Sequence, residues 1–272
     1  MNNPIGVFDS GYGGLTILKE FIKELPDYDY LYLGDNARAP YGTKSFETVY
    51  KYTLECVEWL FQLGCPLVIL ACNTASAKAL RTIQQKDLAR IGPGKRVLGV
   101  IRPTSEIIGT YTKTGHVGIF GTPGTVQSES YLIEINKFSN KTIVTQEACP
   151  MWVSLVENNE VSGPEAEKSI KQHVTRLLQN DPQIDTILLA CTHYPLLMEQ
   201  IKKHVPDTIS IIPQGKIVAA SLKQYLKNHE EIESKCTKQG LRQFFTTGEE
   251  LDFNVKGSTF FGQSVQANHI TL

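Results

Sequence analysis

Residues 67–74 read LVILACNT, and residues 186–193 read TILLACTH. Each stretch is a short apolar run, typical of a buried β-strand, that ends in Ala-Cys and continues with hydroxyl, amide or imidazole side chains. We therefore expect one thiol, Cys72 or Cys191, where each strand stops and the next helix starts. This repeated unit predicts an α/β fold with two matched cysteines, which suits a reaction that needs one acid/base group on each face of a substrate.

Strand and helix patterns alternate outward from these two stretches. We expect strands at 4–8, 28–33, 66–71, 96–100, 116–120, 142–146, 184–190, 208–212, 241–247 and 257–261. We expect helices at 15–25, 45–62, 74–89, 103–112, 123–138, 150–158, 164–179, 195–204 and 215–228. This alternation predicts mostly parallel sheets flanked by helices. In such sheets ligands bind beyond the carboxyl ends of the strands, where both Ala-Cys sequences lie.

The order of these elements predicts two similar α/β domains. We expect residues 1–100 and 212–272 to form one discontinuous domain and residues 101–211 to form the other. Small-molecule sites often lie between domains, so the cleft between the two is the expected active site.

Composition and charge exclude several classes of protein. The chain has 272 residues with 27 basic and 28 acidic side chains, spread without the basic stripe of a nucleic-acid binder. We expect neither a signal peptide nor a membrane span, because no window approaches roughly 20 apolar residues. Six widely spaced cysteines do not predict a disulfide framework. The chain is expected to be soluble, cytoplasmic and reduced.

Cys72 and Cys191 are the leading candidates for chemistry. A single free cysteine is often only a small buried apolar residue, but the repeated setting favours function. A helix N-terminus favours the thiolate, so we expect a thiol pKa lowered from about 8.5 towards neutrality, as a general base requires. The remaining cysteines lack this setting and are expected to be structural: Cys56, Cys65, Cys149 and Cys236.

Three further segments carry candidate polar groups. Residues 9–14, DSGYGG, follow the first strand and open a helix, but Thr16 replaces the third glycine of a dinucleotide fingerprint. This turn could be purely structural, or its N–H groups could hold a carboxylate while Asp9 accepts an ammonium group or orients Cys72. Thr122, in GTPGT at 121–125, could cap a helix or bind a carboxylate.

His193 lies two residues after Cys191. Beside a thiol, an imidazole can share or accept its proton. Cys191 and His193 could also supply two zinc ligands, but no matching Cys-x-x-Cys or His pair completes such a site. We expect no metal.

With these segments identified, the chain resembles the glutamate racemases of the cofactor-independent aspartate/glutamate racemase superfamily. The matching segments are FDSGYGGLT at 8–16, GDNARAPYG at 34–42, ACNTAS at 71–76, GTP at 121–123, ACP at 148–150 and CTHYPL at 191–196. They are collinear, and the two cysteine segments together with the Pro-Tyr-Gly loop are highly specific.

The resemblance implies roles for particular residues. Cys72 and Cys191 are implied to be the two catalytic acid/bases, supported by Asp9, His193 and a carboxylate at Glu157. The positions implied to bind the amino acid are Asp9, Ser10, Tyr41, Gly42, Asn73, Thr74, Thr122, Thr125, Thr192 and His193. Two residues depart from the family pattern: Arg102 stands where glutamate is usual, and Tyr12 replaces a small residue, with consequences for regulation and access respectively.

The resemblance also implies an activity. The substrate is expected to be L- or D-glutamate, with D-glutamate supplied for peptidoglycan, by a homodimer that needs no cofactor. A pyridoxal phosphate racemase would need a Schiff-base lysine, and neither strand end carries one. Two alternatives stay open: an aspartate racemase, whose substrate is one methylene shorter, and a catalytically inactive binding or regulatory protein on the same scaffold.

Overall fold

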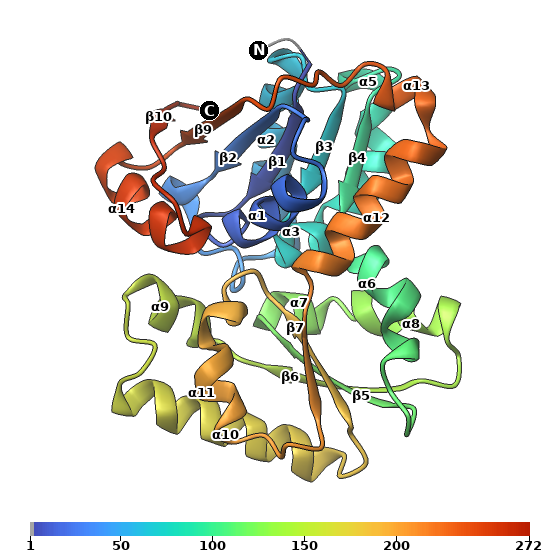
Figure 1. Cartoon of the computed structure of the whole chain (residues 1–272), viewed down its shortest axis with the longest axis vertical. Helices are drawn as coiled ribbons and strands as arrows, with labels where there is room; N and C mark the ends of the chain where they lie inside the picture. Colours follow the sequence, from blue (N-terminus) through green and yellow to red (C-terminus); the bar gives the residue numbers. More distant parts are fainter. Residues whose placement is uncertain (1–2) are drawn as a thin grey trace.

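The computed structural model describes residues 3–272 and contains two parallel β-sheets flanked by helices (Figure 1). The strands of the six-stranded sheet are β1 (Ile5–Asp9), β2 (Tyr30–Gly34), β3 (Leu67–Leu70), β4 (Arg96–Gly99), β9 (Arg242–Thr246) and β10 (Ala267–His269). The strands of the four-stranded sheet are β5 (His116–Gly121), β6 (Ile143–Ala148), β7 (Thr186–Ala190) and β8 (Ser210–Pro213). Every pairing in both sheets is parallel, which confirms the predicted α/β class.

The strand order places both Ala-Cys sequences near the middle of a sheet. The order of the first sheet is β10-β9-β2-β1-β3-β4, and that of the second is β6-β5-β7-β8. β3 lies between β1 and β4, and β7 lies between β5 and β8. All residues of β3 and β7 are buried, as their apolar sequences predict for strands covered on both faces.

Helices cover both sheets. Around the six-stranded sheet lie α1 (Leu15–Glu24), η1 (Asn36–Arg38), α2 (Phe46–Gln62), α3 (Asn73–Lys78), α4 (Leu80–Thr82), η2 (Ile83–Asp87), α5 (Leu88–Ile91), α12 (Gly215–Asn228), α13 (Glu230–Glu233) and α14 (Glu250–Phe261). Around the four-stranded sheet lie α6 (Ile101–Ile107), η3 (Ile108–Thr110), α7 (Pro123–Gln127), α8 (Ser130–Phe138), α9 (Trp152–Glu157), α10 (Pro164–Asn180), η4 (Tyr194–Leu197) and α11 (Met198–Lys202).

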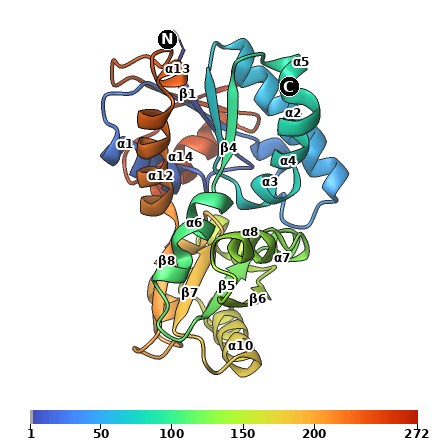
Figure 2. The same cartoon turned by 90° about the vertical axis from the view of Figure 1, so that its right-hand side faces the viewer.

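The chain crosses between the two sheets twice. It leaves the first sheet after β4, builds the second sheet, and returns between β8 and α12. Figures 1 and 2 show the six-stranded part above and the four-stranded part below, with α6 and the start of α12 at the junction. Because both thiols follow strands whose carboxyl ends meet this junction, the fold brings them towards each other.

One predicted strand is wrong. Residues 257–261 lie in α14, and the last strand is β10. The buried residues of α14 are Phe253, Gly257, Phe260 and Phe261. Successive members of this set are four, three and one residues apart, as expected for one face of a helix. The two adjacent phenylalanines at the end of the helix obscured this spacing.

Four predicted helices are interrupted. The expected helix 103–112 divides into α6 and the 3₁₀ turn η3. The expected helix 123–138 divides into α7 and α8 because Glu129 has a left-handed backbone, with φ of 55°. The expected helix 74–89 divides into α3, α4 and the π turn η2, and the expected helix 195–204 begins with the 3₁₀ turn η4. Helical periodicity persists through such breaks, so the sequence pattern does not reveal them.

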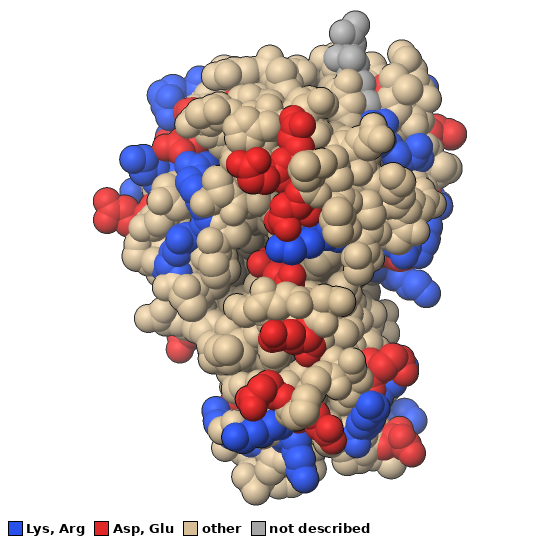
Figure 3. All heavy atoms as spheres, turned by 90° about the vertical axis from the view of Figure 1, so that its left-hand side faces the viewer, with Lys and Arg blue, Asp and Glu red and all other residues tan. Residues whose placement is uncertain are grey.

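The described surface is mixed in charge. On the face drawn in Figure 3, acidic and basic side chains are interspersed over both parts of the molecule. Within residues 3–272, no helix combines the length and the apolar character needed to cross a bilayer.

Candidate active site

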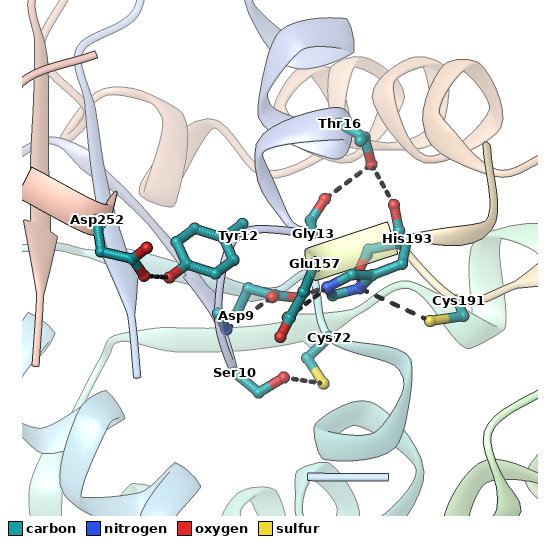
Figure 4. A network of polar contacts seen from close by, with 12 residues as sticks. Asp9, Ser10, Tyr12, Gly13, Thr16, Cys72, Glu157, Cys191, His193 and Asp252 are labelled. Atoms are coloured by element: carbon teal, nitrogen blue, oxygen red, sulfur yellow. Dashed lines mark hydrogen bonds and ion pairs between the residues drawn. The ribbon is translucent and has the colours of Figure 1, made fainter. Parts of the chain in front are cut away.

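Cys72 and Cys191 lie among polar side chains at the junction of the two sheets. Cys72 directly precedes α3, and Cys191 follows β7. Figure 4 shows both thiols with these side chains, which include Asp9, Ser10, Glu157 and His193. Each cysteine is only 6% exposed. Residues from four distant segments of the chain therefore converge around two buried thiols.

The Cys72 thiol has neutral hydrogen-bond partners. Its Sγ donates to Ser10 Oγ at 3.5 Å, and the backbone N–H of Ala75 donates to the same sulfur at 3.5 Å. Burial raises the pKa of Cys72 to about 12, and the Asp9 carboxylate adds to the rise. The expected lowering of this pKa is therefore wrong. The short helix α3 and the Ser10 hydroxyl favour the thiolate, but they do not offset the loss of water and the nearby negative charge.

The Cys191 thiol instead faces an imidazole. His193 Nδ1 lies 3.9 Å from Cys191 Sγ, and His193 Nε2 lies 2.8 Å from Glu157 Oε1. Burial alone would lower the pKa of His193, but the hydrogen bonds to Cys191 and Glu157 outweigh it and raise that pKa to about 10. A protonated His193 can donate one N–H to the sulfur and the other to the carboxylate. This side of the site thus holds a cation next to its thiol.

Asp9 lies between the two sides. It is fully buried, and its Oδ2 accepts the Gly11 N–H at 3.0 Å. Its Oδ1 accepts a hydrogen bond from Thr192 Oγ1 at 3.4 Å. Burial raises the pKa of Asp9, and His193 partly counteracts this. The charge of Asp9 therefore acts both on the Cys72 thiol and on His193, which lies beside Cys191.

Gly13 allows the first loop to approach the Cys191 segment closely. A Cβ at this position would lie 2.2 Å from Thr192 Oγ1 and 2.5 Å from His193 Nδ1. Thr16 fixes the same approach, because its hydroxyl donates to Gly13 O at 2.8 Å and is 3.0 Å from Thr192 O. The glycine-rich turn is thus the point at which the two sheets touch beside the site.

Three threonines form a buried hydroxyl cluster across the junction. Thr74 Oγ1 lies 2.9 Å from Thr122 Oγ1 and 3.5 Å from Thr125 Oγ1. Thr122 also caps α7 by accepting the Thr125 N–H at 3.2 Å. The Gly124 N–H donates to Gly42 O at 2.8 Å, again between the two parts. Hydroxyl and N–H groups of this kind suit an anionic carboxylate.

Two residues expected to bind a ligand turn their side chains elsewhere. The Tyr41 hydroxyl donates to Asp35 Oδ2 inside the six-stranded part, and Tyr41 is 1% exposed. Asn73 Oδ1 accepts from Tyr131 OH at 2.6 Å, and Asn73 Nδ2 donates to Gln214 Oε1 at 2.8 Å. Tyr41 and Asn73 can therefore offer a ligand the N–H and C=O groups of their backbone segments.

The two departures from the family pattern lie outside the thiol pair. Tyr12 is buried, donates to Asp252 of α14 and packs against Phe260 with ring centroids 5.9 Å apart. Phe260 in turn meets His193 edge-on at 5.2 Å. Arg102 is exposed and pairs with Glu106 at 2.9 Å.

The structure also reveals polar residues that sequence reasoning missed. Gln214 and Tyr131 bond to Asn73, and Thr16 joins the two loops. Gln214 follows β8 and precedes α12, the same strand-to-helix position that identified the cysteines, so that signal was available. Tyr131 lies within a helix and had no such signal.

A cavity of about 340 Å³ lies beside Cys191. Its lining includes Thr16, Thr192, Gln214 and Phe260 but not Cys72, so it is not the space between the thiols. Among the residues that the structure describes, no cluster of three or more His, Cys, Asp or Glu side chains could hold a metal ion. The arrangement offers proton transfer by two thiols and binding of anions by hydroxyl and N–H groups.

Comparisons with known proteins give a consistent result. The family described as Asp/Glu/Hydantoin racemase matches residues 14–222. The glutamate racemase of Persephonella marina is 38% identical over 98% of this chain and 97% of its own length. The crystal structure of a glutamate racemase isoform from Bacillus anthracis superposes with a TM-score of 0.89 at 34% identity, covering 99% of this chain and 98% of that one. The Francisella tularensis glutamate racemase, solved in complex with D-glutamate, gives 0.88 at 32% identity, covering 99% and 98%.

Proposed function

The chain belongs to the Asp/Glu/hydantoin racemase family, and we propose that it interconverts L- and D-glutamate, with Cys72 and Cys191 as the two acid/base groups. The observation that carries this proposal is that two buried strand-end thiols, one from each sheet, lie at the same junction, the first bonded to Ser10 and the second facing His193. D-glutamate bound to the F. tularensis relative supports glutamate as the substrate. The product D-glutamate would serve peptidoglycan synthesis.

The proposed reaction transfers one proton off and one proton onto Cα. The thiolate of one cysteine takes the α-proton, forming an S–H bond and leaving the electron pair on Cα and its carboxylate. The thiol of the other cysteine gives its proton to the opposite face of Cα and becomes the thiolate. The opposite enantiomer reacts with the roles exchanged, so each turnover leaves the enzyme ready for the reverse reaction.

The carbanionic intermediate needs strong stabilisation, because neither strand end carries the lysine that would hold pyridoxal phosphate as an electron sink. Ser10, Thr74 and Thr192, with neighbouring N–H groups including that of Asn73, are proposed to hold the α-carboxylate, where the negative charge develops. Thr122 and Thr125 adjoin Thr74 and extend this hydroxyl cluster. Preorganised donors are worth more in a site without water, and both sulfurs are nearly inaccessible here.

The ionisation of the two sides suggests how the resting enzyme is charged. The raised pKa of Cys72 keeps that group a thiol, ready to give a proton. His193 and Glu157 provide the charges that would accompany a proton leaving or reaching Cys191. The substrate's own ammonium group, near Asp9, would supply the positive charge that Cys72 lacks. Asp9 thereby helps Cys72 to act as a base when the other enantiomer is bound.

Further parts of the proposal concern assembly and location. We propose two domains, residues 1–100 with 212–272 and residues 101–211, supported by the division of the strands between two sheets. We propose a homodimer, supported by the family resemblance and testable by sedimentation. We propose a cytoplasmic location, supported by six free cysteines, all among the described residues.

The deciding experiment is a racemisation assay by circular dichroism. Purified protein is incubated with L-glutamate, D-glutamate, L-aspartate or D-aspartate, with no added cofactor. We expect both glutamate enantiomers to lose optical activity much faster than aspartate. Preferential reaction of aspartate would show that aspartate, and not glutamate, is the substrate. No reaction with any of the four would favour a binding protein.

A further inference from the structure

Four buried polar side chains form a closed hydrogen-bond network behind Cys72. Asn73 Nδ2 donates to Gln214 Oε1 at 2.8 Å, and Tyr131 OH donates to Asn73 Oδ1 at 2.6 Å. Gln214 Nε2 donates to Thr104 Oγ1 at 3.1 Å and to the Tyr131 oxygen. All four residues are at most 2% exposed. The oxygen and the nitrogen of each side-chain amide thus have protein partners.

The network joins both crossings of the chain to the segment that carries Cys72. Asn73 is the first residue of α3, directly after Cys72, and Gln214 occupies the return crossing between β8 and α12. Thr104 lies on α6, just after the outgoing crossing, and Tyr131 lies on α8 of the four-stranded part. Figures 1 and 2 show α6, α8 and the start of α12 gathered at this junction.

A second contact from α3 reaches the outgoing crossing. Ser76 Oγ accepts the Val100 N–H at 3.3 Å and donates to Leu70 O at 2.8 Å. Asn73 and Ser76 are three residues apart and so lie on one face of the helix. This face of α3 therefore contacts both crossings. Cys72, which carries the thiol, directly precedes the first residue of this helix.

Buried amides of this kind resist displacement. Leaving one buried donor or acceptor without its partner is costly, so a small rotation of either part against α3 is penalised. Burial also raises the pKa of the Tyr131 hydroxyl, which keeps it protonated as the donor to Asn73 Oδ1.

We propose that Asn73, Gln214 and Tyr131 are positioning residues that set the location of Cys72 Sγ relative to Cys191. This inference rests on the proposed racemisation. It gives the Asn73 side chain a role at the junction, and it leaves the Asn73 backbone N–H to face the substrate. A misplacement of about 1 Å at a reacting group can cost about 100-fold in rate, so a network that fixes the sulfur has a measurable effect.

The test compares two buried tyrosines. Tyr131→Phe removes the hydroxyl from the network, while Tyr30→Phe removes an equally buried hydroxyl that bonds to Leu25 O at 3.1 Å, away from the thiols. Each variant is assayed for kcat, KM and melting temperature. The primary isotope effect is measured with α-deuterated L- and D-glutamate. We expect similar losses of thermal stability, but a fall in kcat of about 10- to 100-fold only for Tyr131→Phe.

The isotope effect separates positioning from a general structural loss. The enantiomers have equal free energy, so kcat/KM must fall by the same factor in both directions for any variant. A displaced Cys72 makes proton removal slower in one direction only, and we expect the isotope effect of Tyr131→Phe to rise mainly for the enantiomer that Cys72 deprotonates.

Should Tyr131→Phe fail to fold, Thr104→Val provides the second measurement, because it removes only one acceptor of Gln214. We then expect a smaller fall in kcat, roughly 3- to 10-fold, with the same directional isotope effect. Wild-type rates and symmetrical isotope effects in the folded variants would overturn the positioning role while the proposed function stands. An inactive wild-type protein would overturn both.

Discussion

Cys72 and Cys191 occupy the same position in two similar strand-to-helix units, yet their surroundings differ. Cys72 has a hydroxyl and a backbone N–H as neighbours, and burial raises its pKa to about 12. Cys191 faces His193, which is in turn bonded to Glu157. A repeated local sequence has thus been placed in two different electrostatic environments. The comparison teaches that two cysteines can follow their strands in the same way and still differ in charge. Cys72 begins the reaction as a neutral thiol, whereas Cys191 has a charged partner.

The largest expected effect comes from removing either thiol. Cys72→Ser and Cys191→Ser should each lower racemisation at least about 10³-fold, because acid/base groups commonly contribute 10²–10⁴-fold and both are needed. Circular dichroism measures this loss. In ²H₂O each variant should still exchange the α-proton of one enantiomer slowly, and the two variants should act on opposite enantiomers. Racemisation within tenfold of wild type in either variant would refute the two-base proposal.

Replacing His193 should separate the two sides most clearly. We expect His193→Asn to lower kcat by about 100-fold, since Cys191 loses its cationic neighbour. The primary isotope effect with α-deuterated glutamate should rise in the direction in which Cys191 takes the proton. An equal rise of the isotope effect for both enantiomers would show that His193 does not assist Cys191 alone. The proposed difference between the surroundings of the two thiols would then be refuted.

A matched pair of glycines tests the contact between the sides. Gly13→Ala places a methyl group against Thr192 and His193, and we expect an activity loss of about 100-fold with destabilisation of about 1–3 kcal/mol. Gly11→Ala is the control, because the nearest atoms to a Cβ there are 3.5 Å away. Activity assays and urea unfolding measure both effects. Equal behaviour of the two variants would contradict the close approach at Gly13.

The corresponding change on the Cys72 side should be smaller. Ser10→Ala removes the hydroxyl that accepts a hydrogen bond from the Cys72 thiol, and one neutral hydrogen bond is worth about 0.5–1.5 kcal/mol. Because the same hydroxyl is proposed to donate to the charged α-carboxylate, where a hydrogen bond is worth about 1.5–3 kcal/mol, we expect kcat to fall roughly 10- to 100-fold. Steady-state kinetics beside His193→Asn provide the measurement. A larger loss for Ser10→Ala than for His193→Asn would reverse the proposed asymmetry.

The last expected effect is on stability as a function of pH rather than on activity. His193 has a pKa of about 10 in the folded protein, above its ordinary value of 6.5, so the folded state binds this proton more tightly. The resulting stability is fully present below pH 6.5 and is lost as the pH rises towards 10. Urea unfolding at pH 7, 8 and 9 should show a decline that is shallower in His193→Asn. Parallel declines in the two proteins would show that His193 does not retain its proton.

Local pattern accounts for the elements that were predicted correctly. The buried strands β3 and β7, the thiols at their ends and the glycine-rich turn each show in a few consecutive residues. The strand predicted at 257–261 was wrong because its five residues, GSTFF, are too few to show the helical period of a face that begins at Phe253. Short apolar runs carry little information on period, whereas longer amphipathic stretches do.

The sequence by itself determined the α/β class, the two strand-end cysteines and the family to which the chain is similar, because these depend on periodicity and on residues adjacent along the chain. Only the tertiary structure decided that the Cys72 pKa is raised, that Glu157 bonds to His193, and that the Asn73 side chain faces the junction. Asn73 and Gln214 are 141 residues apart, and Cys72 and Ser10 are 62 apart. Burial, charge pairing and hydrogen bonding between such distant residues are set by how the two sheets pack, which no local pattern records.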